Sequence, residues 1–92
     1  MSASHIHVSH PRIVLRLKRA QGHLRSVIAM IEAGRSCLEL AQQLHAVEAA
    51  LGGAKRELIH DHIENCLEAP AGEAEGVPAA TLHELKALTK YL

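Results

Sequence analysis

Two cysteines and one histidine carry the clearest chemical signal in this sequence. His62 and Cys66 are spaced i, i+4, so a helix places them on one face about one turn apart. A neutral imidazole and a thiolate make half of a binding site for a borderline or soft transition metal. The same spacing also arises for purely structural reasons, so this pair alone does not establish a metal site.

Cys37 supplies a third candidate ligand, but it lies far from the pair along the chain. If Cys37 and His62 belong to one helix, a rise of about 1.5 Å per residue separates them by roughly 37 Å. Two copies of that helix packed antiparallel would bring Cys37 of one chain to His62 and Cys66 of the other. Two-fold symmetry would then create two equivalent sites per dimer. The alternative is that Cys37 is a small buried apolar residue at a helix start.

Histidine is the commonest metal ligand in proteins, and this chain contains 8 of them. Three lie in the short N-terminal arm, residues 1–10: His5, His7 and His10. This arm can supply a fourth ligand to the site. The alternative is that these histidines are solvated or bind metal only adventitiously.

The spacing of apolar residues predicts a first helix over 11–33. Its apolar positions recur at alternating steps of four and three residues, which is a heptad seam. These positions are Ile13, Leu17, Ala20, Leu24, Val27 and Ile31. Ser9 or His10 is the expected N-cap before Pro11, because proline is favoured at the first helical position, and Gly34 is the expected C′ residue.

A second helix is expected over 36–67, with Ser36 as the N-cap and Glu39 as its capping-box partner. Its seam repeats the same spacing at Leu40, Leu44, Val47, Leu51, Ala54 and Leu58. Gly52 and Gly53 lie inside this helix and weaken it by roughly 1 kcal/mol each relative to alanine. A kink at the two glycines is therefore an open alternative.

Beyond the second helix, residues 69–78 have the composition of a linker, and a short third helix is expected over 79–92. The chain has 92 residues, with no Trp, no Phe and one Tyr, so its core must consist almost wholly of aliphatic side chains. This composition favours an all-α fold in a single domain. Two long helices with continuous seams cannot bury themselves alone, so we expect an oligomeric helical bundle.

The formal net charge is zero, but the charges are divided along the chain. Residues 1–31 contain Arg and Lys and no acid, whereas residues 61–78 contain acids and no Arg or Lys. A basic stripe runs beside the seam of the first helix, at Arg12, Arg16, Arg19 and His23. A positive stripe on an ordered helix is a candidate phosphate-binding surface, and the alternative is an ordinary solvated face.

Several function classes are disfavoured by what the sequence lacks. No apolar run is long enough to span a membrane, and the N-terminus does not have the pattern of a secretory signal. We therefore expect a cytoplasmic protein, without a membrane partner, in which both thiols stay reduced. No pairing of a nucleophile with a base and an orienting acid indicates an enzyme.

The stretch from Arg16 to Leu67, which begins RLKRAQGHLRSV and ends ELIHDHIENCL, resembles the CsoR/RcnR family of bacterial metal- and stress-responsive transcriptional repressors. The spacing of Cys37, His62 and Cys66 is specific to that family. The resemblance implies a three-helix protomer, an antiparallel four-helix-bundle dimer and a dimer of dimers. It also implies operator DNA binding through basic residues of a helical face, and release of the DNA when the effector binds.

The resemblance further implies a ligand set. Cys37, His62 and Cys66 match the Cys-His-Cys set of the family's copper(I) sensors. The nickel and cobalt sensors add an N-terminal histidine, and His5 falls at that position, although His7 and His10 are alternatives. Cu(I) needs only three soft ligands, whereas Ni(II) prefers four or more. The four-residue set that includes His5 therefore favours Ni(II) or Co(II), with Cu(I) as the alternative. Glu84 matches a family acid that hydrogen-bonds the ligand histidine and fixes its tautomer.

For DNA binding, the resemblance points to basic residues on the helical face. The candidates are Arg12, Arg16, Lys18, Arg19, Lys55 and Arg56. The chain departs from the family pattern at Glu48 and Gly53, where several members carry arginines that contribute to DNA binding.

The sequence therefore predicts a repressor that binds operator DNA without metal and is released on Ni(II) or Co(II) binding, which derepresses metal efflux or resistance genes. A Cu(I)-responsive repressor of the same family is the first alternative. A metal carrier or storage bundle is the second. It has the same ligands but gives the basic stripe no role, so a DNA-binding assay separates it from a repressor.

Overall fold

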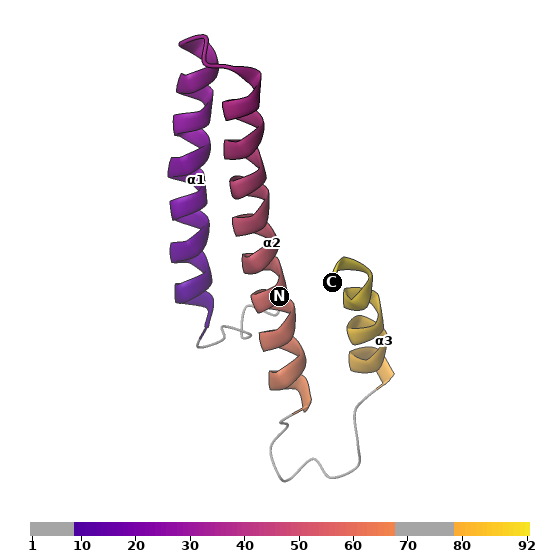
Figure 1. The fold of residues 1–92 in the computed structure, drawn as a ribbon. Coiled ribbons are helices and arrows are strands. Elements are labelled where there is room, and N and C mark those ends of the chain that lie inside the picture. Colours follow the sequence, from indigo (N-terminus) through magenta and orange to yellow (C-terminus); the bar gives the residue numbers. More distant parts are fainter. Residues whose placement is uncertain (1–8, 68–78) are drawn as a thin grey trace.

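The computed structural model describes residues 9–67 and 79–92, and in these two stretches it contains helices and no strand. Helix α1 spans His10–Glu32, α2 spans Cys37–Leu67 and α3 spans Ala79–Leu88, which is followed by a 3-10 turn, η1, at Thr89–Tyr91. α1 and α2 form an antiparallel hairpin, and α3 lies beside α2 on the side away from α1 (Figure 1). The predicted all-α fold is confirmed.

The start of α1 differs from the expectation in its cap. Ser9 occupies the N-cap position, but its backbone is helical, with φ −78° and ψ −13°, and its side chain makes no capping hydrogen bond. An N-cap side chain reaches the first N–H groups from an extended backbone, so this conformation explains the missing bond. The carbonyl of Ser9 instead accepts the first helical bond, from the N–H of Ile13 at 3.0 Å.

Gly34 closes α1, as its position in the sequence predicts. It has φ +76°, a conformation that residues with a Cβ rarely adopt. Its N–H donates to the carbonyl of Ile31 at 3.1 Å, and the N–H of Arg35 donates to the carbonyl of Met30 at 3.1 Å. These two bonds are the Schellman pattern, and they turn the chain back toward α2.

α2 begins at Cys37 because Ser36 caps it. The N–H of Glu39 donates to Oγ of Ser36 at 3.2 Å, and the Ser36 hydroxyl donates to Oε1 of Glu39 at 3.4 Å. Nη2 of Arg35 donates to Oε2 of Glu39 at 2.6 Å. This hydrogen bond and the arginine charge lower the pKa of Glu39. The position of Cys37 is therefore fixed at a well-anchored helix start.

The core of the hairpin is one narrow stripe of small and branched side chains. Ile13, Ala20 and Val27 of α1 are buried, as are Val47, Ala54 and Ile59 of α2. Most of these positions are alternate members of the two predicted seams. Small residues such as Ala20 and Ala54 let the two helices approach closely, but they bury little apolar area.

Six of the other seam members remain largely outside this core. They form what we call the apolar face: Leu17, Leu24 and Ile31 of α1 with Leu44, Leu51 and Leu58 of α2. Their side chains are 41–53 % exposed. A groove of about 380 Å³ runs along this face, lined mainly by Leu17, Leu24 and Leu51. An exposed apolar surface of this kind on a small protein marks a site of association.

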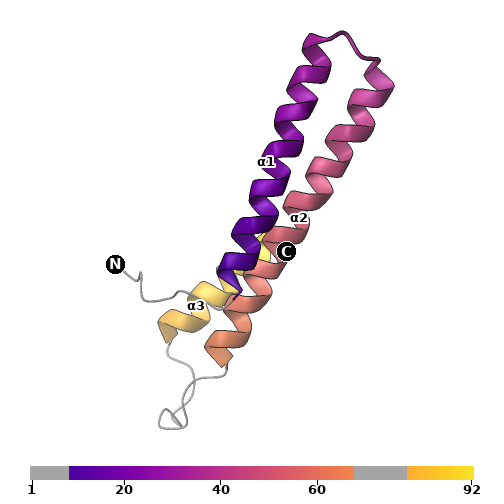
Figure 2. The same cartoon turned by 90° about the vertical axis from the view of Figure 1, so that its left-hand side faces the viewer.

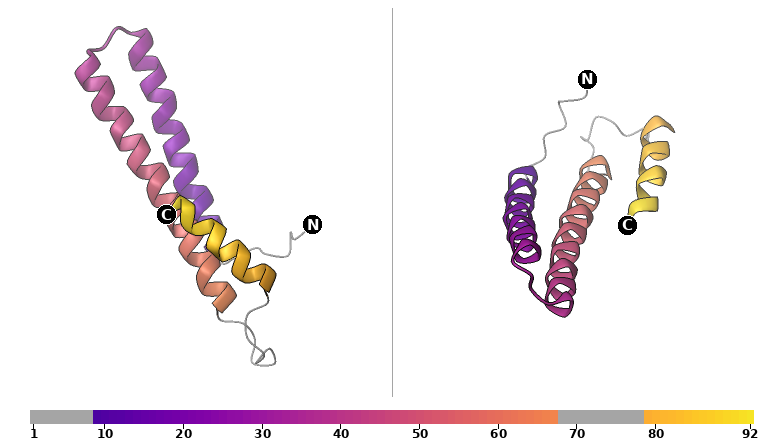
Figure 3. Two further views of the ribbon diagram at one scale, coloured as in Figure 1. Left: turned by 90° about the vertical axis from the view of Figure 1, so that its right-hand side faces the viewer. Right: turned by 90° about the horizontal axis from the view of Figure 1, so that it is seen from above.

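α2 runs from Cys37 to Leu67 without interruption, so the two glycines do not break it. Its last turns extend past the beginning of α1 in both Figure 1 and Figure 2. That part of α2 therefore lacks α1 as a neighbour and packs with α3 instead. α3 crosses it at an angle, as Figure 3 shows. No helix in the described stretches is long and apolar enough to cross a membrane.

Candidate metal centre and nucleic-acid interface

His62 lies in the part of α2 that extends beyond α1, and there it contacts α3. Its Nε2 lies 2.9 Å from Oε1 of Glu84. Because a carboxylate only accepts, Nε2 carries the proton, and Nδ1 is then the ring nitrogen suited to bind a metal. The His62 side chain is 22 % exposed, so neighbouring groups cover most of its surface. The contact that the resemblance implies between Glu84 and His62 is thus present within one protomer.

Cys37 lies at the opposite end of α2, where it is exposed and not in a disulfide. The helix between Cys37 and His62 is unbroken, so the estimate of roughly 37 Å between them holds for this protomer. Among the residues that the structure describes, no three His, Cys, Asp or Glu side chains gather closely enough to hold a metal ion. One protomer does not bring Cys37 and His62 together.

Two of the predicted ligands are not described at the level of side chains. His5 lies outside the described residues, and so do the alternative His7 and the side chain of Cys66. The backbone of Cys66 belongs to α2, one turn after His62. His10, the third alternative, is the first residue of α1 and is partly buried.

The candidate ligands share a face of α2 with the exposed leucines. Cys37, Leu44, Leu51 and Leu58 recur every seven residues, which returns a helix to nearly the same direction after two turns. His62 follows Leu58 by one further turn. Cys37 and His62 therefore stand at the two ends of the apolar face rather than on the far side of the helix.

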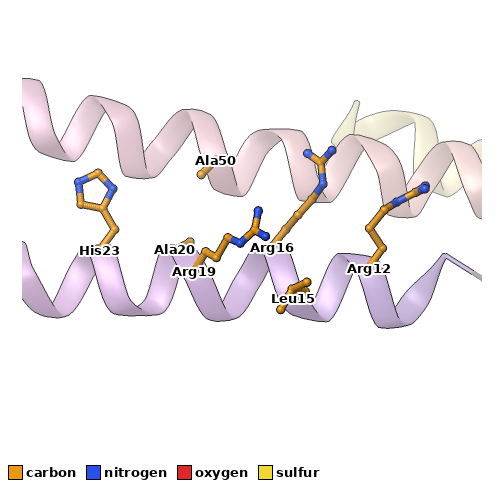
Figure 4. Close-up of a pocket in the computed structure, with 7 residues that line it drawn as sticks. All are labelled: Arg12, Leu15, Arg16, Arg19, Ala20, His23 and Ala50. Carbon is orange, nitrogen blue, oxygen red and sulfur yellow. The ribbon is translucent and has the colours of Figure 1, made fainter.

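A basic groove lies on the other side of the hairpin. Its volume is about 580 Å³, and it is lined by Arg12, Leu15, Arg16, Arg19, Ala20, His23 and Ala50. Figure 4 shows the three arginines and the histidine in a row along α1, with Ala50 of α2 facing them. Ala50 is too small to fill the space in front of the row. The predicted basic stripe therefore forms one wall of a groove, and that wall carries the positive charges.

The structure does not bring the other three basic candidates into this groove. Lys18 lines the groove of the apolar face, beside Leu17. Lys55 and Arg56 are exposed on α2, and neither lines the basic groove. A Cβ added at Gly52 would lie 3.4 Å from Nη1 of Arg56, so the arginine folds back over its own helix.

Two residues of α2 that the sequence reasoning did not single out contact the stripe. Glu57 forms ion pairs with both Arg12 and Arg16, and the latter joins Oε1 to Nε at 3.2 Å. Oε1 of Gln43 lies 2.6 Å from Nε2 of His23. The sequence does contain a signal for these contacts, because a row of α2 residues spaced by seven includes Gln43, Ala50 and Glu57. In an antiparallel hairpin this row lies against the basic stripe of α1.

A model of the family described as metal-sensitive transcriptional repressor matches residues 9–91, which is nearly the whole of the described chain. The chain belongs to the metal-sensitive transcriptional repressor family. Its resemblance to CsoR/RcnR proteins, inferred from sequence, is thereby confirmed. The family consists of transcriptional repressors and not of enzymes.

Relatives of this chain differ in the metal named for them. The copper-sensing transcriptional repressor CsoR of Mycobacterium ulcerans (strain Agy99) is 37% identical over 76 residues, or 83% of this chain and 63% of that protein. This chain therefore spans just under two thirds of that relative. The copper-sensing transcriptional repressor CsoR of Bacillus subtilis (strain 168) is 32% identical over 81 residues, or 86% of this chain and 80% of that protein.

A solved structure of the nickel-responsive transcriptional regulator InrS has the same fold. The TM-score is 0.78 at 34% sequence identity, and the alignment covers 96% of this chain and 98% of that chain. Copper and nickel are thus both named for proteins similar to this chain. The choice between them has to come from the ligands.

Proposed function

We propose that this protein binds operator DNA in its metal-free state and releases it when Ni(II) or Co(II) binds between two protomers. Its targets would be genes of metal efflux or resistance, and it would act in the cytoplasm. The observation that carries the proposal is that Cys37 and His62 stand at the two ends of one exposed apolar face of α2. A second copy that covers this face completes the metal site as it buries the leucines.

The heptad spacing gives the dimer a natural register. If Leu51 of each protomer lies at the two-fold axis of antiparallel α2 helices, Leu44 of one faces Leu58 of the other. The same register sets Cys37 opposite position 65 of the partner subunit, which His62 and Cys66 flank in sequence. Leucine packing and ligand assembly therefore require the same alignment of the two helices.

The proposed donors suit a borderline transition metal. Cys37 offers an accessible sulfur, and Glu84 holds the ring of His62 in the tautomer that leaves Nδ1 as the donor atom. With Cys66 and His5, the set has two sulfurs and two imidazoles, a mixed set that Ni(II) and Co(II) accept. Bound there, the ion supplies the bonds that join the two protomers at each end of the apolar face.

The basic groove is the proposed DNA contact. Arg12, Arg16 and Arg19 project from one face of α1, and guanidinium groups bind phosphate oxygens in bidentate fashion. Each phosphate that an arginine neutralises releases condensed counterions, which makes the affinity strongly dependent on salt. The row lies along the helix, so it suits a DNA backbone better than a single small anion.

Release of the DNA requires that the metal site be coupled to the basic groove, and the hairpin of α1 and α2 connects the two. Cys37 begins α2 directly after the tight turn at Gly34 that ends α1, the helix of the arginines. A change in how one hairpin packs on its partner would therefore move both arginine rows relative to each other. Such couplings between sites are typically about 1–3 kcal/mol.

The proposal is tested by measuring DNA binding and metal binding on the same protein. An operator duplex is selected from a random-sequence pool with the metal-free protein, and its release is followed by fluorescence anisotropy as Ni(II), Co(II) or Cu(I) is added. We expect release by Ni(II) or Co(II), with thiolate charge-transfer absorption that His5→Ala weakens. Metal binding with no selectable DNA would overturn the repressor and favour a carrier or storage bundle.

Copper is the second candidate effector, because the M. ulcerans and B. subtilis relatives are copper-sensing repressors. Cys37, His62 and Cys66 alone satisfy Cu(I), which needs no fourth ligand. In that case Cu(I) would release the DNA, Ni(II) and Co(II) would not, and His5→Ala would leave the response unchanged. The variant therefore separates the two metals independently of their affinities.

A further inference from the structure

Glu57 is an acidic residue that contacts two arginines of the basic groove. It lies on α2, directly opposite Arg12 and Arg16 of α1, and forms ion pairs with both. Its side chain is only 18 % exposed, whereas the two arginines are 65 % and 53 % exposed. The Glu57 side chain is thus largely buried, whereas the side chains of the two arginines are largely exposed to solvent.

The two carboxylate oxygens are divided between the two arginines. Oε2 faces Nε and Nη2 of Arg12, and Oε1 faces Nε of Arg16. A guanidinium has five N–H donors in a fixed fork, so a contact through Nε leaves the four donors of Arg16 on Nη1 and Nη2 for another acceptor. The Glu57 carboxylate thus contacts Arg16 at Nε. The outer N–H groups, on Nη1 and Nη2, are the ones that phosphate recognition uses.

We propose that Glu57 is a positioning residue for DNA binding: it holds Arg12 and Arg16 side by side so that their outer N–H groups face the groove. The inference rests on the proposed binding of DNA by this groove. Without the carboxylate, two adjacent like charges on flexible side chains would separate, and each would lose conformational freedom on binding a phosphate.

A competing role would have the opposite effect. If Glu57 merely neutralised the groove, incoming phosphate would displace it, and its removal would strengthen DNA binding. Burial argues against displacement. Oε1 of Glu57 is shielded from solvent, and its contact with Nε of Arg16 is an ion pair without full hydrogen-bond geometry. Pulling Arg16 away would leave a buried, charged oxygen without any partner, which is costly.

The positioning role and the neutralising role predict opposite changes in DNA affinity when Glu57 is replaced. Full-length wild type, Glu57→Ala and Glu57→Gln are titrated with a labelled random-sequence DNA duplex over a series of salt concentrations, by fluorescence anisotropy. We expect Glu57→Ala to weaken binding about tenfold, within the range of coupling for residues in contact. Glu57→Gln keeps an acceptor oxygen and the shape of the side chain, so we expect it to recover part of the loss.

Glu64→Gln is the matched control, because it removes the same charge from an exposed position of the same helix. We expect it to bind DNA as tightly as wild type or more tightly. In an Arg12→Ala, Arg16→Ala background, Glu57→Ala should no longer weaken binding, a result that a general loss of structure would not give. Far-ultraviolet circular dichroism and the Ni(II) affinity should be unchanged in the Glu57 variants.

Tighter or unchanged DNA binding by both Glu57 variants would overturn the positioning role. The proposed function fails in a different way. If wild type binds the duplex no better than Arg12→Ala, Arg16→Ala at low salt, the groove does not bind DNA, whatever Glu57 does.

Discussion

His62 of α2 and Glu84 of α3 are joined by a 2.9 Å hydrogen bond between Nε2 and Oε1. The bond ties α3 to the end of the hairpin where the proposed metal ligand lies. Removing a carboxylate that orients a ligand histidine typically lowers metal affinity about 10- to 100-fold. We expect a loss in this range for Ni(II) with Glu84→Ala, measured by competition with a chelator.

Lys86→Ala is the control for that variant, because it changes another exposed residue of α3. It should leave the Ni(II) affinity unchanged. Equal affinities for Glu84→Ala and wild type would mean that the hydrogen bond holds α3 in place and does nothing for the metal.

The apolar face predicts the effect of placing a charge at its centre. Leu51 is 45 % exposed in the protomer and lies at the two-fold axis of the proposed dimer. Leu51→Glu would set two carboxylates against each other in an apolar interface, so we expect the dimer to dissociate in sedimentation experiments. Leu15→Glu, at a comparable exposure of 51 % but beside the basic groove, should leave the dimer intact. Dissociation by both variants, or by neither, would contradict the assignment of the interface.

The sequence predicts the helices of this protein well because their signals are local. The heptad spacing of leucines, the positive-φ glycine at position 34 and the Ser36 cap each act within a few residues, and the structure has all three. The expected side-chain cap at Ser9 is absent for a local reason as well. A serine two residues before Pro11 suits an N-cap, but its side chain caps only if the backbone is extended, and here the Ser9 backbone is helical.

The candidate site is harder to predict from sequence because it depends on contacts between helices. Spacing could place Arg12, Arg16 and Arg19 on one face, but it could not exclude Lys18, Lys55 and Arg56 from the groove. Glu57 was missed because its role depends on the register of α2 against α1, which the turn at Gly34 sets. The contact of Glu84 with His62 followed from the family resemblance, and no periodicity in the sequence indicates it.

The basic groove predicts a difference between two arginines of the same helix. Arg16 lines the groove, whereas Arg25 is exposed and does not. Arg16→Ala should weaken operator binding and make the dependence of log K on log salt less steep, because fewer counterions are released. Arg25→Ala removes the same charge and should leave both quantities close to those of wild type. The measurement is a salt series of anisotropy titrations; equal losses for the two variants would mean that only net charge matters.

The start of α2 predicts a stability that depends on pH. Hydrogen bonding to Arg35 lowers the pKa of Glu39 below its ordinary value of 4.5. The ionised carboxylate therefore contributes fully above pH 4.5, and the contribution is lost as the pH falls through the lowered folded-state pKa. Glu39→Gln should reduce the loss of thermal stability on acidification below that value. Melts that retain the full acid dependence in this variant would assign it to other carboxylates.

The cap itself is tested separately by Ser36→Ala. Loss of an N-cap side chain costs about 1 kcal/mol, so we expect a decrease of that size in the free energy of unfolding, measured with urea. Ser26→Ala, in the exposed part of α1, is the control and should change stability little. Because Cys37 follows the cap directly, Ser36→Ala should also weaken Ni(II) binding slightly.

The central claim is that each metal site takes Cys37 from one protomer and His62 from its partner. Cys37→Ala and His62→Ala are purified separately, then unfolded and refolded together, and Ni(II) binding is followed by thiolate charge-transfer absorption. Each variant alone should lack the tight site. In the mixture, half of the dimers are hybrids that carry one complete site, so we expect tight binding at about a quarter of the wild-type stoichiometry. A mixture that binds no more Ni(II) than the separate variants would contradict the shared site.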